Sequence, residues 1–99
     1  MVAGTVGGLG FLMATVYIPS GWRDLTLDVA TLELEGGTLR QIVEALDARF
    51  AGIAERVCDG EGIAAGLAVS IDGAIASRGL RSPVKPSSEI HFLPAIGGG

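Results

Sequence analysis

The spacing of apolar residues predicts one amphipathic helix in the middle of the chain. Apolar side chains recur there at intervals of three and four residues while charged ones fill the other side, the apolar set being Leu39, Ile42, Val43, Leu46 and Phe50. This spacing places the set on one face of a helix. Thr38 and Gln41 have the spacing of a capping box, which begins a helix, and Gly52 is a stop signal. The pattern therefore predicts a helix that starts at Leu39 and ends before Gly52.

Alternating apolar and polar residues predict short strands on both sides of this helix. Before it, the β-branched and aromatic run 14–19 indicates a first strand. The alternation over 25–29, repeated in the opposite phase over 31–35, indicates a kinked second strand. After the helix, 53–57 continues as an irregular turn and 58–62 is a loop. The later strands are predicted at 67–71, 74–76 and 89–93, with the proline- and glycine-containing segment 77–88 mostly loop.

This order of elements predicts the fold. A hairpin, one helix crossing the sheet, and a last strand beside the first give the apolar side of the helix a single sheet to cover. The expected class is α+β, of the ubiquitin-like β-grasp type. Its mixed sheet has about five strands, and one main helix packs on one face.

The two ends of the chain differ in composition from its middle. Residues 1–12 are apolar, uncharged and rich in glycine, without the basic residues of a secretory signal, and this run is too short to cross a bilayer. We interpret 1–12 as a flexible N-terminal extension, 13–95 as the folded domain, and 96–99 as a flexible glycine-rich tail.

Composition narrows the range of partners. Eleven acidic and seven basic residues give a net charge of −4, and no basic run is interleaved with aromatic residues, so we expect no nucleic-acid partner and no membrane partner. The single cysteine, Cys58, excludes an internal disulfide and a paired-thiol redox motif. A reducing, cytoplasmic setting is expected.

Candidate catalytic residues inside the domain are few. His91 has no second histidine with which to bind a metal, and its alternating position predicts a place on a sheet face. Cys58 lies beside Asp59 and Glu61, whose charges are expected to raise the pKa of the thiol and disfavour a reactive thiolate. We predict no metal site and no bound cofactor.

The most specific motif is at the end of the chain. The predicted last strand is followed by Pro94, Ala95 and Ile96, and then by Gly97, Gly98 and Gly99. Glycines have no side chain, so such a tail can enter a narrow channel and present its carboxylate to another protein's active site. This ending predicts a protein that is acted upon rather than an enzyme.

The helix segment 44–53, the strand and turn 69–73, and the run 90–96 before Gly98 and Gly99 resemble the MoaD/ThiS family of sulfur carrier proteins. The resemblance covers about residues 14–99, and the terminal diglycine is its specific part. It implies that an E1-like enzyme uses ATP to adenylate the Gly99 carboxylate and that a sulfur donor converts it to a thiocarboxylate. A sulfur-accepting synthase of molybdopterin, cysteine or thiamine biosynthesis then receives the sulfur.

Residue roles follow from the same resemblance. Gly99 is the reacting residue and Gly98 and Gly97 are spacers, while the expected partner contacts are Leu93, Ile96 and Phe92. Two alternatives remain open. One is a ubiquitin-like modifier that forms isopeptide bonds through the tail, and the other is a β-grasp binding module whose tail is never activated.

Overall fold

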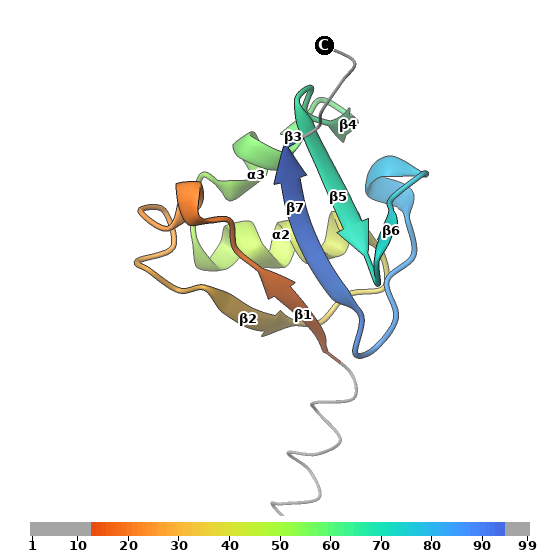
Figure 1. The fold of residues 1–99 in the computed structure, drawn as a ribbon, viewed down its shortest axis with the longest axis horizontal. Coiled ribbons are helices and arrows are strands. Elements are labelled where there is room, and N and C mark those ends of the chain that lie inside the picture. The colour runs from red at the N-terminus through yellow and green to blue at the C-terminus, as the bar shows by residue number, and fades with distance from the viewer. Residues whose placement is uncertain (1–12, 95–99) are drawn as a thin grey trace, which may run out of the picture.

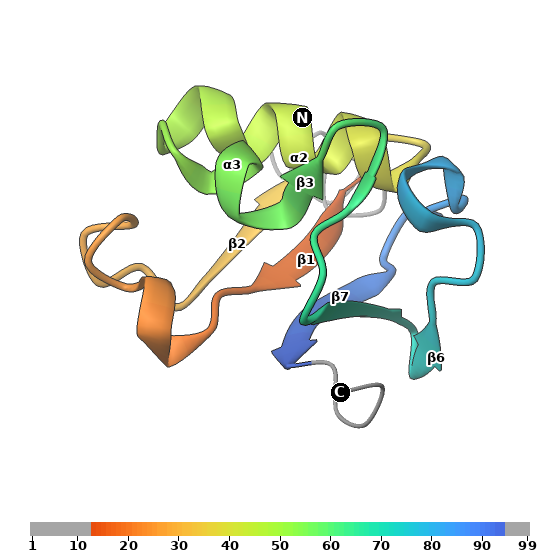
Figure 2. The same cartoon turned by 90° about the horizontal axis from the view of Figure 1, so that it is seen from above.

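The computed structural model describes residues 13–94. Its elements are β1 (Ala14–Tyr17), β2 (Thr31–Leu34), α2 (Leu39–Arg49), α3 (Ile53–Val57), β3 (Cys58–Asp59), β4 (Gly62–Ile63), β5 (Leu67–Ile71), β6 (Ala74–Ile75) and β7 (Glu89–Pro94), with 3-10 turns at Ser20–Trp22 and Gly79–Arg81. One mixed sheet has the strand order β2-β1-β7-β5-β6, and α2 and α3 lie on one side of it (Figure 1, Figure 2). The β-grasp prediction is confirmed.

The centre of the sheet joins the two ends of the described chain. β1 runs parallel to β7, with Val16 opposite Ile90, and antiparallel to β2. β7 also runs antiparallel to β5, where Val69 lies opposite Phe92. The expected placement of the last strand beside the first is therefore confirmed, and β7 is held by hydrogen-bonded neighbours on both sides.

Helix α2 starts and ends where its signals predict. The Thr38 hydroxyl accepts from the Gln41 N–H at 3.3 Å, and the Gln41 side chain accepts from the Gly37 N–H at 2.7 Å. Together these bonds satisfy backbone donors at the start of the helix. Gly52 has a φ of +105°, a left-handed conformation that glycine adopts without strain, and it separates α2 from α3.

Replacing the cap residue tests how much this start contributes. We expect Thr38→Ala to lower the free energy of unfolding by about 1 kcal/mol, because the Gln41 N–H loses its acceptor. Urea unfolding followed by circular dichroism measures the change. Thr38→Ser keeps the hydroxyl and serves as the control. An unchanged free energy in the alanine variant would contradict a stabilising cap.

The prediction of a strand over 25–29 is wrong. Leu27 and Asp28 have φ values of 53° and 67°, which are left-handed and incompatible with a strand, and the Leu27 side chain is 80% exposed. Thr26 is buried instead, and its hydroxyl donates to the Val29 carbonyl at 3.0 Å. The segment is a compact loop that buries the polar Thr26 and exposes the apolar Leu27, and of the predicted second strand only Thr31–Leu34 pairs with β1.

Two further segments are more regular than the sequence predicts. The expected loop 58–62 contains the small hairpin of β3 and β4, with Cys58 opposite Ile63. The expected irregular turn 53–57 is the separate helix α3. Its start is capped by the Asp47 carboxylate, which accepts from the Gly52 and Ala54 N–H groups, both at 3.0 Å.

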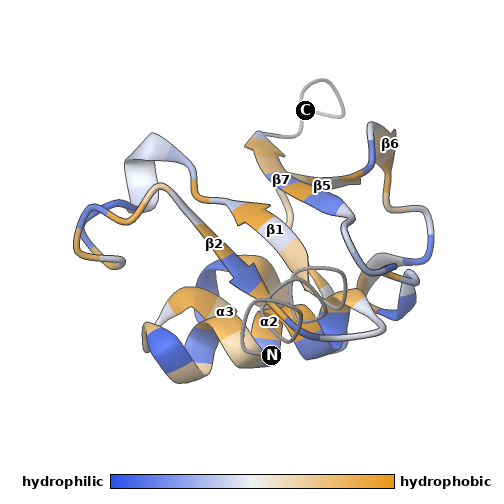
Figure 3. Ribbon diagram, turned by 90° about the horizontal axis from the view of Figure 1, so that it is seen from below, coloured by the Kyte–Doolittle hydropathy of each residue, from blue (hydrophilic) through white to orange (hydrophobic). Residues whose placement is uncertain are grey.

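A single core lies between the sheet and the helices, and Figure 3 shows apolar and polar positions alternating along both layers. Its fully buried large side chains come from both layers and from the 3-10 turn Gly79–Arg81, and include Val16, Leu39, Ile42, Leu46, Ile53, Val69, Leu80 and Ile90. Within residues 13–94, no helix has the length and apolar character needed to cross a membrane.

Candidate functional site

The structure describes only two of the six predicted site residues. Phe92 and Leu93 lie near the end of β7, whereas Ile96 and the three glycines 97–99 lie outside the described residues, as does residue 95 of the predicted domain. The described part of the site is therefore the end of β7, residues 92–94, which we call the neck. Leu93 and Pro94 of the neck are paired with Ala68 and Leu67 of β5.

The two predicted site residues in the neck, Phe92 and Leu93, face opposite sides of the sheet. Phe92 is 5% exposed and packs against Trp22, with ring centroids 5.1 Å apart. Leu93 is 40% exposed and lies on the face away from the helices, because successive strand residues point to opposite faces. Phe92 thus anchors the neck in the core, and Leu93 is the accessible apolar group.

The face of the sheet away from the helices carries a row of paired side chains across four strands. Strand register places Tyr17 beside His91, His91 beside Ser70, and Ser70 beside Ile75. The Tyr17 and His91 rings are stacked, with centroids 4.2 Å apart and an interplanar angle of 4°. The predicted sheet-face position of His91 is confirmed, but no local sequence signal pointed to its stacking partner.

Asp72 ties the turn after β5 to the start of β7. Its carboxylate accepts from the Glu89 N–H at 2.9 Å and from the Ser88 hydroxyl at 2.7 Å. The backbone bond from Glu89 and then the Ser88 bond lower the pKa of Asp72 below its ordinary value of 3.8. Asp72 also has a φ of 53°, a conformation that aspartate and asparagine tolerate better than most residues.

The hydrogen bonds that the Asp72 carboxylate accepts make the stability of the domain depend on pH. Because its pKa is lower in the folded state, its contribution is present above the ordinary value of 3.8 and is lost as pH falls through the folded value. We expect Asp72→Asn to be less stable than the parent at neutral pH and to lose less stability on acidification. Thermal unfolding at a series of pH values tests this. Parallel curves for the two proteins would contradict it.

Cys58 is not an activated thiol. Its pKa is raised, and the main cause is burial, which Arg40 partly offsets and to which Asp47 and Glu44 add. The predicted direction is therefore confirmed, but the predicted cause is wrong. Glu61, one of the two acids named from the sequence, is instead ion-paired with Arg40 at 2.9 Å.

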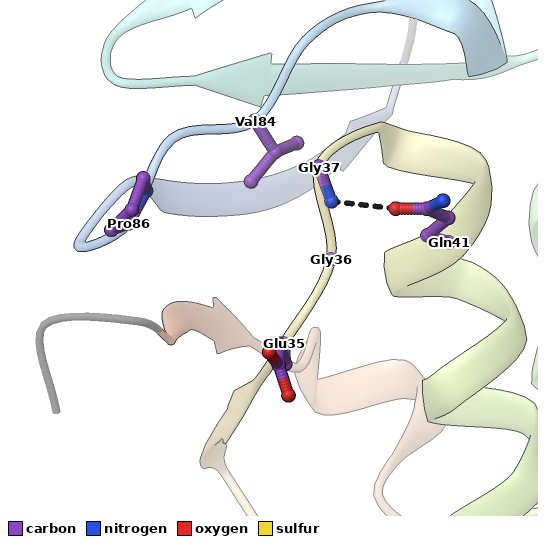
Figure 4. A pocket seen from close by; sticks show the side chains of 6 residues that line it. All are labelled: Glu35, Gly36, Gly37, Gln41, Val84 and Pro86. Atoms are coloured by element: carbon purple, nitrogen blue, oxygen red, sulfur yellow. Dashed lines mark hydrogen bonds between the residues drawn. The ribbon is translucent and has the colours of Figure 1, made fainter. Parts of the chain in front are cut away.

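An open hollow of about 480 Å³ lies beside the start of α2 (Figure 4). It is lined by Glu35, Gly36, Gly37, Gln41, Val84 and Pro86. A Cβ at Gly36 would lie 3.1 Å from the Cβ of Gln41, so this glycine permits the close approach of strand and helix. Glu35 is the one ionisable group in the lining, and residues 13–94 contain no group of three potential metal ligands. The hollow therefore has the features of a structural junction rather than of a reaction site.

Comparisons with known proteins give a family match and several similar structures. Residues 16–99 match the ThiS family. The chain is similar to one in the crystal structure of the BexX/CysO complex of Amycolatopsis orientalis, at 31% identity and a TM-score of 0.80, covering 87% of this chain and 99% of that one. The chain is also similar to CysO of Mycobacterium tuberculosis, with 25% sequence identity and a TM-score of 0.78. This match covers 84% of this chain and 99% of that one.

The same comparison extends to more distant structures. The small archaeal modifier protein SAMP1 of Methanosarcina acetivorans is 20% identical with a TM-score of 0.70, covering 88% of this chain and 96% of that one, which is a likeness of fold alone. No curated protein sequence matches the chain.

Proposed function

Because the chain belongs to the ThiS family of sulfur carrier proteins, we propose that Gly99 is the residue that carries the sulfur. Carriers of this family bear a C-terminal thiocarboxylate and are substrates of E1-like enzymes rather than enzymes themselves. The observation that carries the proposal is the family match, which extends to residue 99 and so includes all three glycines.

The chemistry proposed for Gly99 has two steps. A carboxylate oxygen of Gly99 attacks the α-phosphate of ATP on an E1-like enzyme, releasing pyrophosphate and forming an acyl adenylate. A sulfur nucleophile from a donor then attacks the activated carbonyl carbon, AMP leaves, and a thiocarboxylate remains. The sulfur of the thiocarboxylate is a soft nucleophile that attacks an electrophilic carbon of a substrate on the acceptor enzyme and forms a new C–S bond. Water then cleaves the acyl–sulfur bond, which leaves the sulfur on the product and regenerates the Gly99 carboxylate.

The neck supports this proposal by its rigidity. β7 is paired on both sides and Phe92 is held against Trp22, so the chain leaves the sheet from a fixed point at Pro94. We propose that residues 13–95 dock as one body on the enzyme and that 96–99 enter its active site, with Gly97 and Gly98 as spacers. Leu93 and Ile96 contact the enzyme on either side of the domain boundary.

The sulfur acceptor is proposed to be a synthase of molybdopterin, cysteine or thiamine biosynthesis. Similarity to two CysO chains makes the cysteine branch the first to test. The structure of the BexX/CysO complex is an example of such a carrier bound to a partner enzyme.

Mass spectrometry tests the proposed chemistry directly. The full chain is incubated with an E1-like enzyme from the same organism, ATP and a sulfide source, and its C-terminal peptide is analysed. We expect one oxygen-to-sulfur exchange confined to Gly99, and none in Gly99→Val. An isopeptide remnant of the tail on other proteins would instead assign a modifier. An unreacted tail beside a demonstrably active enzyme would overturn the proposal in favour of a binding module.

The contact proposed for Leu93 can be tested separately. We expect Leu93→Ala to raise the KM for the carrier in the activation reaction about tenfold with little change in kcat, because an exposed apolar anchor is lost from the docked complex. Leu27→Ala is the matched control, since Leu27 is also exposed but lies outside β7. Equal KM values for the two variants would contradict a role for Leu93.

A further inference from the structure

One edge of the sheet concentrates positive charge on an acidic chain. The net charge is −4, yet residues 74–88 contain Arg78, Arg81 and Lys85 and no acidic residue. All three side chains are exposed. The ion pair found within residues 13–94 joins Arg40 to Glu61, so in that part of the chain these three cations have no carboxylate within salt-bridge distance. We call Ile75, Arg78, Arg81 and Lys85 the basic edge.

The basic edge is presented by a loop that is tied to the core. Leu80 and Val84, which alternate with the cations along the loop, are 2% and 5% exposed. The Ser82 carbonyl accepts from the Leu39 N–H at 2.9 Å, and the Val84 N–H donates to the Gly37 carbonyl at 3.0 Å. Because the backbone is already fixed, a ligand that binds here orders only the tips of the cationic side chains.

The basic edge also borders an unpaired strand. β6 is the last strand of the sheet and pairs with β5 on one side, while its other side has no strand partner in the described chain (Figure 1). An open hollow of about 450 Å³ runs along it, with Ile71, Ile75 and Pro83 in its lining and Arg78 and Lys85 among its polar groups. Ile75 is 60% exposed. The edge can therefore offer backbone hydrogen bonds, an apolar contact and positive charge together.

Among the described residues that line this hollow, Asp72 is the one acid, and its charge offsets part of the charge of Lys85. Asp72 lines the same space, but its two carboxylate oxygens accept from Ser88 and Glu89. Its charge holds the turn before β6 against the start of β7. Arg78 and Arg81 have no carboxylate within salt-bridge distance in the described part of the chain and are left for a ligand from outside.

We propose that the basic edge binds an extended, acidic segment of a partner protein, which adds alongside β6 and places an apolar side chain against Ile75. The positive charge of the basic edge favours a ligand with carboxylates, and the unpaired backbone of β6 favours a ligand with an extended backbone. The exposed isoleucine favours a peptide over a phosphate ion or a nucleic-acid strand, which have no aliphatic side chain to bury there. This contact does not involve Gly99 and is independent of the sulfur chemistry.

An NMR titration of the isotope-labelled full chain tests the proposal. The probe is a short blocked peptide of alternating glutamate and valine, and the matched control peptide has glutamine in place of glutamate. We expect shifts concentrated over residues 74–85 and a Kd on the order of 1 mM at low salt. Binding should weaken as the Debye length falls from about 10 Å at 0.1 M to about 3 Å at 1 M ionic strength.

Charge-reversed variants locate the contact. Arg78→Glu with Arg81→Glu should weaken binding at least about tenfold. Arg49→Glu with Arg56→Glu changes the net charge equally at exposed arginines of the two helices and should leave binding unchanged. If the first variant unfolds, Arg78→Gln with Arg81→Gln takes its place.

Several results would overturn the proposal. These are the absence of shifts at saturating peptide, equal binding of the glutamine peptide, equal weakening by both charge-reversed pairs, or shifts centred on another strand. A stronger response to inorganic phosphate or to a short oligonucleotide than to the acidic peptide would assign the surface to an anion or to nucleic acid instead.

Discussion

Gly99→Val is expected to reduce thiocarboxylate formation at least about 100-fold while leaving the fold intact. A branched side chain on the reacting residue displaces the carboxylate in an active-site channel sized for glycine, and misplacement by about 1 Å is enough for a loss of that size. Because the core described within residues 13–94 keeps all its side chains in this variant, we expect the free energy of unfolding to stay unchanged. ATP–pyrophosphate exchange and mass spectrometry of the C-terminal peptide measure the two steps separately.

Removing Gly99 is an informative companion to this variant. The shortened chain still ends in two glycines, so it keeps the chemistry of the tail but loses about 3.4 Å of reach. We expect it to react more slowly than the parent and faster than Gly99→Val. Full activity in Gly99→Val would disprove the assignment of the reacting residue. Equal loss in both variants would show that reach matters as much as side-chain bulk.

Leu46→Ala is expected to lower the free energy of unfolding by about 3 kcal/mol. Leu46 is fully buried at the centre of the helix face that packs on the sheet, so truncation removes buried methyl groups and leaves a cavity. A domain of this size has a total stability of roughly 5–15 kcal/mol, so this loss is a large part of it. Urea unfolding measures the change, with the exposed Leu27→Ala as a control expected to stay within about 0.5 kcal/mol.

This variant also separates folding from chemistry. Below its unfolding midpoint, Leu46→Ala should still be activated at Gly99, because the neck and the tail are unchanged. A loss of stability under about 1 kcal/mol would show that the helix does not pack on the sheet as described. Loss of activation in the folded variant would show that the helix itself contacts the enzyme.

The helix and the last strand could be predicted from sequence because their signals are local. The cap at Thr38 and Gln41 and the stop at Gly52 depend on residues within one or two turns of one another, and the structure places both where they were expected. The segment 25–29 was misassigned because its apolar and polar residues alternate as in a strand, although the loop that forms does not bury the apolar ones in alternation. Leu27 is 80% exposed where a strand would bury it, and the polar Thr26 beside it is buried and donates a hydrogen bond to the Val29 carbonyl.

Some features of the candidate site could likewise be predicted from the sequence, and others could not. The glycines 97–99 and the family resemblance were readable from the sequence, and the family match agrees with them. The sequence does not show which apolar residue of the neck is accessible, because Phe92 and Leu93 are adjacent and similar in hydrophobicity. Their exposure differs because Phe92 points to the face of the sheet that packs into the core, where it contacts Trp22, and Leu93 points to the opposite face.

The sequence by itself thus determined the order of helix α2 and of the five strands of the main sheet, and the apolar face of that helix, since these depend on neighbours along the chain. Only the tertiary structure decided the pairing of Tyr17 with His91, the exposure of Leu93, and the unpaired position of β6 beside three cations. The physical reason is that sheet register and edge position follow from contacts between residues far apart in sequence. No local pattern records which strands become neighbours.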